Sequence, residues 1–144
     1  MADDARYMKL ALTEAKEAYR RDEVPIGAVV VLNDMVIGRG HNLTETLSDV
    51  TAHAEIQAIT AAEQTIGSKY LEGCTIYVTV EPCVMCAGAM YWAKIARLVY
   101  GAPDDKYGYT VAAPHSLHPK TTVTSGVLAD DCAQLMKDFF KNKR

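Results

Sequence analysis

The sequence lacks any long hydrophobic segment. No run within its 144 residues approaches the ~18 uncharged apolar residues that a membrane-spanning helix needs. The chain starts Met1-Ala2-Asp3-Asp4, which places acids where a secretory signal has basic residues. A large excess of positive charge is also missing, because 15 Lys and Arg face 18 Asp and Glu. This balance argues against nonspecific coating of nucleic acid. We expect a cytoplasmic protein with no membrane segment.

Cysteine is scarce as well, which excludes a disulfide-rich mini-protein. In a cytosolic chain of this size, four cysteines indicate metal binding or catalysis before disulfides. The composition, with 49% hydrophobic and 23% charged residues, is typical of a soluble globular protein. No linker, low-complexity run or internal repeat interrupts it. We therefore predict a single domain over residues 1–144.

Helical and strand patterns alternate along the chain and predict an α/β fold. Specifically, we expect a three-layer α/β/α arrangement around a central mixed five-stranded sheet, with an early hairpin making the sheet mixed. The polar segment 41–50 and most of 101–121 are expected to be loops, and a loop as long as the second is often functional. The expected helices cover 3–20, 51–64, a segment opened by Pro82, and 130–143; the expected strands are 28–32, 35–37, 74–80, 98–100 and 123–127.

Two short motifs stand at predicted helix starts: Thr51-Ala52-His53-Ala54-Glu55 and Glu81-Pro82-Cys83-Val84-Met85-Cys86. Thr51 is a candidate cap for the first helix. Cys83 and Cys86 are one helical turn apart, so both sulfurs can point the same way. Thiolates and an imidazole are ligands that Zn²⁺ prefers, and three protein ligands leave a tetrahedral position open, as in catalytic zinc sites. We predict that His53, Cys83 and Cys86 bind Zn²⁺.

Glu55 is the candidate catalytic base beside that position. Residues two apart do not share a helix face, so His53 and Glu55 converge only if His53 is a non-helical cap, and we predict that geometry. Alone, the Cys pair is also compatible with a redox dithiol, a structural zinc half-site or two core cysteines. Together, the two motifs match the zinc-deaminase signature H-x-E…P-C-x-x-C. For Cys74 and Cys132 we expect buried packing.

On these motifs the chain resembles the cytidine/deoxycytidylate deaminase superfamily, and within it the bacterial tRNA-specific adenosine deaminases. The resemblance covers almost the whole chain. It implies a cytidine deaminase-like fold and a hydrolase that converts adenosine to inosine at the wobble position of a tRNA anticodon. The similar stretches are 23–31, 51–56, 77–90 and 126–130, with the ending Asp138-Phe139-Phe140 followed by Lys141, Lys143 and Arg144.

The resemblance also implies partners and site residues. Such enzymes are homodimers whose tRNA contacts both subunits, with zinc held by the His and Cys ligands and Glu55 shuttling the proton. The implied substrate-binding residues are Ile26, Asn42, Ala54 through its backbone N–H, and Asp104. Other roles stay open: Asn42 can hold its own loop, Ile26 can be core, and Asp104 and Asp105 can be solvated turn residues.

Some features depart from the family pattern. The mild acidity means that RNA binding needs a local basic patch, for which the candidates are Lys94, Arg97, Lys106 and Lys120 with the C-terminal tail. Tyr91-Trp92-Ala93 is more similar to guanine deaminases. The alternative function is therefore deamination of a free nucleobase or nucleoside such as guanine, and a noncatalytic zinc-stabilised module is a further alternative. The roles of Tyr107, Tyr109, His115 and His118 stay open.

Overall fold

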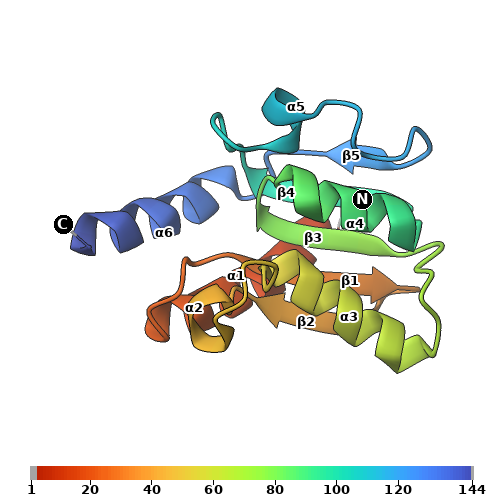
Figure 1. Cartoon of the computed structure of the whole chain (residues 1–144), viewed down its shortest axis with the longest axis horizontal. Helices are drawn as coiled ribbons and strands as arrows, with labels where there is room; N and C mark the ends of the chain where they lie inside the picture. Colours follow the sequence, from red (N-terminus) through yellow and green to blue (C-terminus); the bar gives the residue numbers. More distant parts are fainter. Residues whose placement is uncertain (1–2, 144) are drawn as a thin grey trace.

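A computed structural model describes residues 3–143; Met1, Ala2 and the basic Arg144 of the tail lie outside the described residues. Figure 1 shows helices packed around a single sheet, with the last helix reaching out from the body. In chain order the elements are α1 (Asp4–Arg20), β1 (Gly27–Leu32), β2 (Met35–His41), α2 (Thr44–Leu47), α3 (Ala54–Ile66), β3 (Thr75–Val80), α4 (Val84–Ala93), β4 (Arg97–Ala102), α5 (Tyr109–Ala112), β5 (Thr122–Thr124) and α6 (Ala129–Asn142).

The sheet has five strands in the order β2-β1-β3-β4-β5. Strand β1 runs antiparallel to both β2 and β3, whereas β3, β4 and β5 run parallel to one another. A parallel pair needs a crossover connection, and α4 provides it between β3 and β4. The predicted mixed five-stranded sheet is confirmed.

Alternate residues of the inner strands feed two separate hydrophobic clusters, one on each face of the sheet. On β1, Ala28 and Val30 pack with α3 and α4, whereas Val29 and Val31 pack with α1 and α6. Side chains of a strand point alternately to opposite faces, so each inner strand contributes to both clusters. Helices therefore cover both faces, as Figure 1 shows, and the predicted three layers are confirmed.

Two glycines of β2 allow α3 to lie directly on the sheet. A Cβ atom on Gly38 would sit 2.4 Å from the Ala58 carbonyl oxygen, and one on Gly40 would sit 2.5 Å from the Ala54 carbonyl oxygen. Only glycine fits such an approach of two backbones. The small buried side chains of α3, Ala54 and Ala58 among them, complete the contact. The position of the start of α3 thus depends on the glycines of β2.

Several boundaries differ from those predicted. Short helices α2 and α5 lie within segments expected to be loops, because four residues are too few to show hydrophobic periodicity. Strand β2 continues through Gly38 and Gly40 to His41. Glycine usually weakens a strand, but here it leaves room for the backbone of α3. Strand β5 ends at Thr124 rather than Val127. Within residues 3–143, no helix has both the length and the apolar character needed to cross a bilayer.

A partly buried ion pair fastens the start of α1 to the sheet. The Arg97 guanidinium donates to both carboxylate oxygens of Asp4, at 2.8 and 2.7 Å, and to the Thr124 hydroxyl at 2.9 Å. The Tyr77 hydroxyl donates to the same carboxylate at 3.0 Å. The hydrogen bond from Arg97 holds the pKa of Asp4 below its usual value. The charge of Arg97 is therefore compensated within the fold by Asp4.

We predict that Asp4→Asn lowers the free energy of unfolding by about 1–2 kcal/mol at neutral pH, between the values typical of exposed and buried pairs. Because the folded pKa of Asp4 lies below the unfolded one, its stabilisation is present above the unfolded pKa and is lost as pH falls through the folded pKa. The two proteins should therefore converge in acid, which urea unfolding at a series of pH values measures. The control is Glu17→Gln, which removes an exposed pair with Arg20 and Arg21 and should change nothing measurable.

Candidate active site

His53 occupies the N-cap of α3 in extended backbone conformation, with φ −72° and ψ 156°. Because a cap residue is not yet helical, its side chain is not confined to the face that the helix spacing assigns. Glu55 follows in the first turn of α3. The geometry predicted for His53 is confirmed, whereas the expectation that Thr51 caps this helix was wrong. Thr51 instead donates to the Asp49 carboxylate in the preceding turn.

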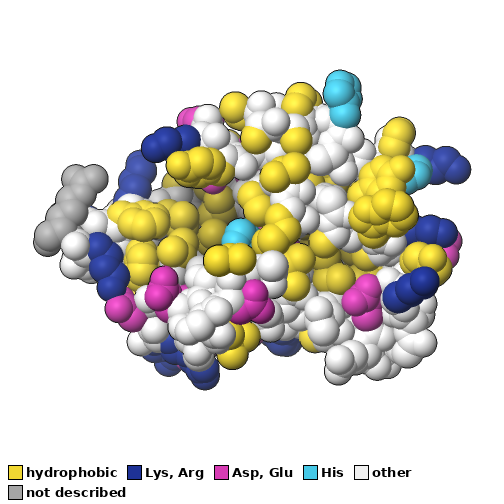
Figure 2. Space-filling model, in the orientation of Figure 1, with side chains coloured by type: hydrophobic (Ala, Val, Ile, Leu, Met, Phe, Trp, Pro, Cys, Tyr) yellow, Lys and Arg dark blue, Asp and Glu magenta, His cyan; other side chains and the backbone are white. Residues whose placement is uncertain are grey.

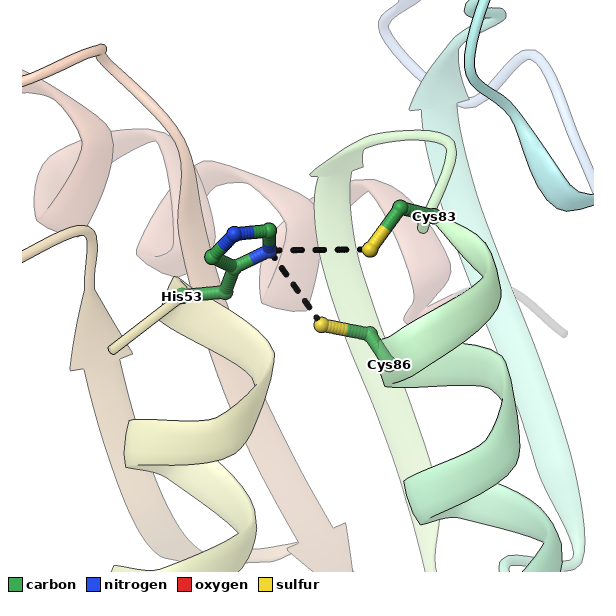
Figure 3. A group of neighbouring side chains, drawn as sticks. All are labelled: His53, Cys83 and Cys86. Carbon is green, nitrogen blue, oxygen red and sulfur yellow. Dashed lines mark hydrogen bonds between the residues drawn. The ribbon is translucent and has the colours of Figure 1, made fainter. Parts of the chain in front are cut away.

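Cys83 is the N-cap residue of α4, in extended backbone conformation like His53, with φ −76° and ψ 176°. Cys86 lies in the first turn of that helix. Pro82 precedes this cap rather than opening the helix itself. Both sulfurs lie 3.6 Å from His53 Nδ1. Figure 3 shows the imidazole and the two thiols, from two different helices, pointing toward one another. Among residues 3–143, these three form the only group of His, Cys, Asp and Glu compact enough to hold a metal ion.

The charges of this group favour a bound divalent cation. A hydrogen bond from Cys86 lowers the pKa of Cys83 to about 4. The same hydrogen bond to Cys83, together with burial, raises the pKa of Cys86, because it keeps the proton on the Cys86 sulfur. A cation is needed to hold both as thiolates. The distances agree with this reading, since tetrahedral zinc bonded to nitrogen and sulfur separates those atoms by about 3.6 Å.

Glu55 is buried beside this group, with 4% of its surface exposed. Burial raises the pKa of the Glu55 carboxyl to about 7, while the positive charge of His53 and a hydrogen bond with Cys86 act in the opposite direction. A carboxyl with such a pKa can both accept and return a proton near neutral pH. A strongly shifted group next to potential metal ligands is typical of a catalytic site.

The other predicted substrate-binding residues fall in two separate segments, one with Ile26 and Asn42 and one with Asp104. Asn42 is buried; its N–H donates to the Ile26 carbonyl at 3.2 Å, and its side-chain oxygen accepts from the Thr44 N–H at 3.1 Å. Ile26 is partly buried against the same hydrophobic cluster as Ala54. The structure therefore brings Ile26 and Asn42 together, and Asn42 also holds its own loop.

Asp104 lies apart from them, in the turn that precedes α5. Its carboxylate accepts from the N–H groups of Lys106 and Tyr107 at 3.0 and 2.9 Å. Tyr107 is exposed, whereas Tyr109 is buried and packs edge-on against Tyr100. The side chain of Asp104 thus organises its turn.

The remaining histidines and cysteines lie outside the metal-binding group. His118 packs against the Tyr91 ring, and its Nδ1 accepts from the Lys120 N–H. Cys74 and Cys132 are buried in the two hydrophobic clusters, on opposite faces of the sheet. The expected packing role of these two cysteines agrees with this placement.

Sequence reasoning missed two buried acids, Glu23 and Glu81, to which it assigned no role. Each accepts three hydrogen bonds from a segment beside the site. Glu81 stands at the end of an apolar strand, where an acid is unusual, and this is the one signal that could have drawn attention to it. Glu23 follows a helix rich in charge, so nothing in its sequence context distinguishes it.

Known proteins are similar to this chain in sequence and in fold. The family model of the MafB19-like deaminases matches residues 2–144. A tRNA-specific adenosine deaminase of Agrobacterium fabrum is 46% identical over 149 aligned residues, which cover 100% of this chain and 98% of that protein. A solved structure from work on A-to-I editing by tRNA:A34 deaminases at the wobble position of transfer RNA has a TM-score of 0.85 and 46% identity, over 90% of this chain and 98% of that one.

A more partial similarity is to a guanine deaminase. The X-ray structure of guanine deaminase from Bacillus subtilis is 38% identical with a TM-score of 0.66, over 76% of this chain and 67% of that one. The match to the tRNA-specific enzyme is higher in identity and in coverage of both chains. The chain therefore belongs to the MafB19-like deaminase family and shares its full length with the tRNA-specific adenosine deaminases, as its sequence motifs predicted.

Proposed function

We propose that this protein converts adenosine to inosine at the wobble position of a tRNA anticodon. The observation that carries the proposal is the group of His53, Cys83 and Cys86 with the buried Glu55 beside it, in a chain that aligns end to end with tRNA-specific adenosine deaminases. The reaction is hydrolytic: water adds at C6 of the purine and the amino group leaves as ammonia. Neither a redox dithiol nor a noncatalytic zinc module needs a buried carboxyl with a pKa of about 7 at this position.

Zinc would be held by His53 Nδ1 and the thiolates of Cys83 and Cys86. When bound, it would supply a Lewis acid that makes water a better nucleophile near neutral pH. Glu55 would accept a proton from the attacking water. The same carboxyl would pass this proton to the ring nitrogen, then take the remaining proton from the hydroxyl added at C6 and pass it to the departing amine, a double role that its pKa of about 7 suits.

Substrate binding would involve Ile26, Asn42, the N–H of Ala54 and Asp104. Ile26 would pack on the purine, Asn42 would hydrogen-bond its edge, and Asp104 would lie near the ribose. The target base has to leave the stack to reach Glu55, and an anticodon loop offers such a base at low cost. The hydrogen bond between Asn42 and Ile26 supports a shared role for this pair.

The mild acidity of the chain does not prevent local RNA contacts. Figure 2 shows Lys and Arg side chains at the left, over α6 and the segment leading to α5, with Asp and Glu side chains below them and further Lys and Arg at the right; a recess lies close to where α3 and α4 begin. A positive region beside the site would bind the phosphates of a stem-loop. We place the enzyme in the cytoplasm, acting there as one domain per chain.

For this proposed function, the first prediction separates proton transfer from metal binding. Glu55→Gln should retain one zinc ion per chain and lose roughly 100- to 10,000-fold in kcat, because only the general acid–base is removed. His53→Ala should lose both zinc and activity, since it removes a ligand. Metal analysis and inosine formation measure the two properties.

The matched control for the zinc measurement is Cys74→Ala, which removes a buried thiol away from the site. It should keep its zinc. Full activity in Glu55→Gln, or full zinc content in His53→Ala, would contradict the assignment.

The second prediction concerns the substrate. A tRNA anticodon stem-loop with adenosine at the wobble position should give a kcat/KM at least ~100-fold higher than free guanine, because contacts remote from the base help to drive catalysis. The assay compares inosine formation with ammonia release. A stem-loop with guanosine at that position serves as the control and should not react. Faster deamination of free guanine would favour the alternative function.

The third prediction concerns assembly, which the resemblance implies is a homodimer. Exposed apolar side chains on α4, including Trp92 at 76% and Val84 at 50% exposure, are consistent with a protein contact there. We expect sedimentation equilibrium at micromolar concentration to give twice the chain mass of 15.7 kDa. A monomer mass for active enzyme would refute the dimer.

A further inference from the structure

Two buried glutamates lie outside the predicted catalytic and ligand residues, one in each flank of the site. Glu23 has 0% and Glu81 has 5% of its surface exposed. Each carboxylate accepts two backbone N–H groups and one threonine hydroxyl from a short helix or its approach. Buried carboxylates are rare unless their charge is compensated, so a matching pair invites a common explanation.

Glu23 holds the segment that contains α2. Its carboxylate accepts from the Glu45 N–H at 3.1 Å, and from the N–H and hydroxyl of Thr46 at 2.6 Å each. Burial alone would raise the pKa of Glu23, but these hydrogen bonds hold it below its usual value. The carboxylate therefore stays charged, which makes each bond stronger than one between neutral groups.

Glu81 holds the segment that contains α5. Its carboxylate accepts from the Asp104 N–H at 3.1 Å, the Thr110 N–H at 3.0 Å and the Thr110 hydroxyl at 2.6 Å. Gly108 lies against the same carboxylate, and a Cβ atom there would sit 2.2 Å from an oxygen of Glu81. The segment can approach this closely only because residue 108 has no side chain.

We call 42–47, bound by Glu23, and 103–112, bound by Glu81, the clamped segments. They carry the proposed substrate-binding residues Asn42 and Asp104. The side chain of Asn42 accepts from the Thr44 N–H at the start of α2, and its backbone N–H donates to Ile26, three residues after Glu23. Asp104 is bound to Glu81 directly. Figure 1 shows α2 and α5 on opposite sides of the place where α3 and α4 begin. Each carboxylate thus holds a segment on one side of the starts of α3 and α4.

We propose that Glu23 and Glu81 are positioning residues for the deamination, which hold the two segments around the site so that an unstacked nucleotide is gripped between Ile26 and Asn42 on one side and the Asp104 turn on the other. This proposal rests on the proposed function. Neither glutamate touches the reacting atoms. Segments that are already ordered reduce the entropy cost of binding the substrate. Loosening them therefore weakens substrate binding more than it slows the chemical step.

The test uses Glu23→Gln and Glu81→Gln in the full-length zinc-loaded enzyme, because the amide keeps the shape and removes one acceptor and the charge. We expect KM for the anticodon stem-loop to rise roughly 10- to 100-fold, because the loosened segment has to be ordered each time the substrate binds. We expect kcat to change less than about threefold and the zinc content to be unchanged. Hydrogen exchange should accelerate in 42–47 only for the first variant, and in 103–112 only for the second.

The matched controls are Glu45→Gln on α2 and Asp105→Asn beside Asp104, which make the same chemical change at exposed positions of the same segments. Both should behave as wild type. If the glutamine variants fold poorly, Thr46→Val and Thr110→Val remove a single hydroxyl from each clamp and should give smaller changes of the same kind.

The outcomes separate this proposal from the one on which it rests. Unchanged KM with faster exchange in the clamped segment would overturn the positioning role. Loss of zinc together with kcat would also overturn it, because the glutamates would then support the metal site. Failure of the wild-type enzyme to act on the stem-loop would contradict the proposed function. The positioning role of Glu23 and Glu81 would still be tested by local hydrogen exchange and by KM for whichever purine substrate the enzyme does deaminate.

Discussion

The site depends on two residues held in extended backbone at the starts of two helices. His53 and Cys83 both precede their helices as N-cap residues, so each side chain can turn toward the other helix. Glu55 and Cys86 follow in the first turns, close to the same point. The partial positive charge of helix N-termini also stabilises thiolates and a carboxylate. A regular helix through His53 would separate it from Glu55 and dissolve the group.

The sheet decides that these two helix starts meet. Strands β2 and β3 both run antiparallel to β1, so they end at the same edge of the sheet, and α3 and α4 follow them in the chain from that edge. Gly38 and Gly40 let α3 lie close enough for the imidazole to reach the sulfurs. The close packing that sets the 3.6 Å separations is therefore established in the β2–α3 contact, well away from the reacting atoms.

Buried acids in this protein follow two different rules. Asp4 and Glu23 are paired with donors that keep their pKa values low. At Glu55 burial outweighs the favourable interactions and raises the pKa to about 7. The first kind stabilises structure, because its charge is compensated. The second kind is suited to proton transfer. A buried acid whose charge is not fully compensated is unfavourable for stability, and such exceptions are expected at a functional site.

The sequence alone determined the chemistry of the site and the class of fold. The chemistry of the site is contained in two short motifs, which hold His53, Glu55, Cys83 and Cys86. The fold class follows from strand and helix periodicities, which indicate the buried faces. Both are local properties of the sequence. Only the tertiary structure decided that Arg97 binds Asp4, that Glu23 and Glu81 grip short helices, and that β2 continues through its glycines. Such pairings join residues far apart in the chain, and hydrogen-bond partners at that separation leave no periodic trace in a single sequence.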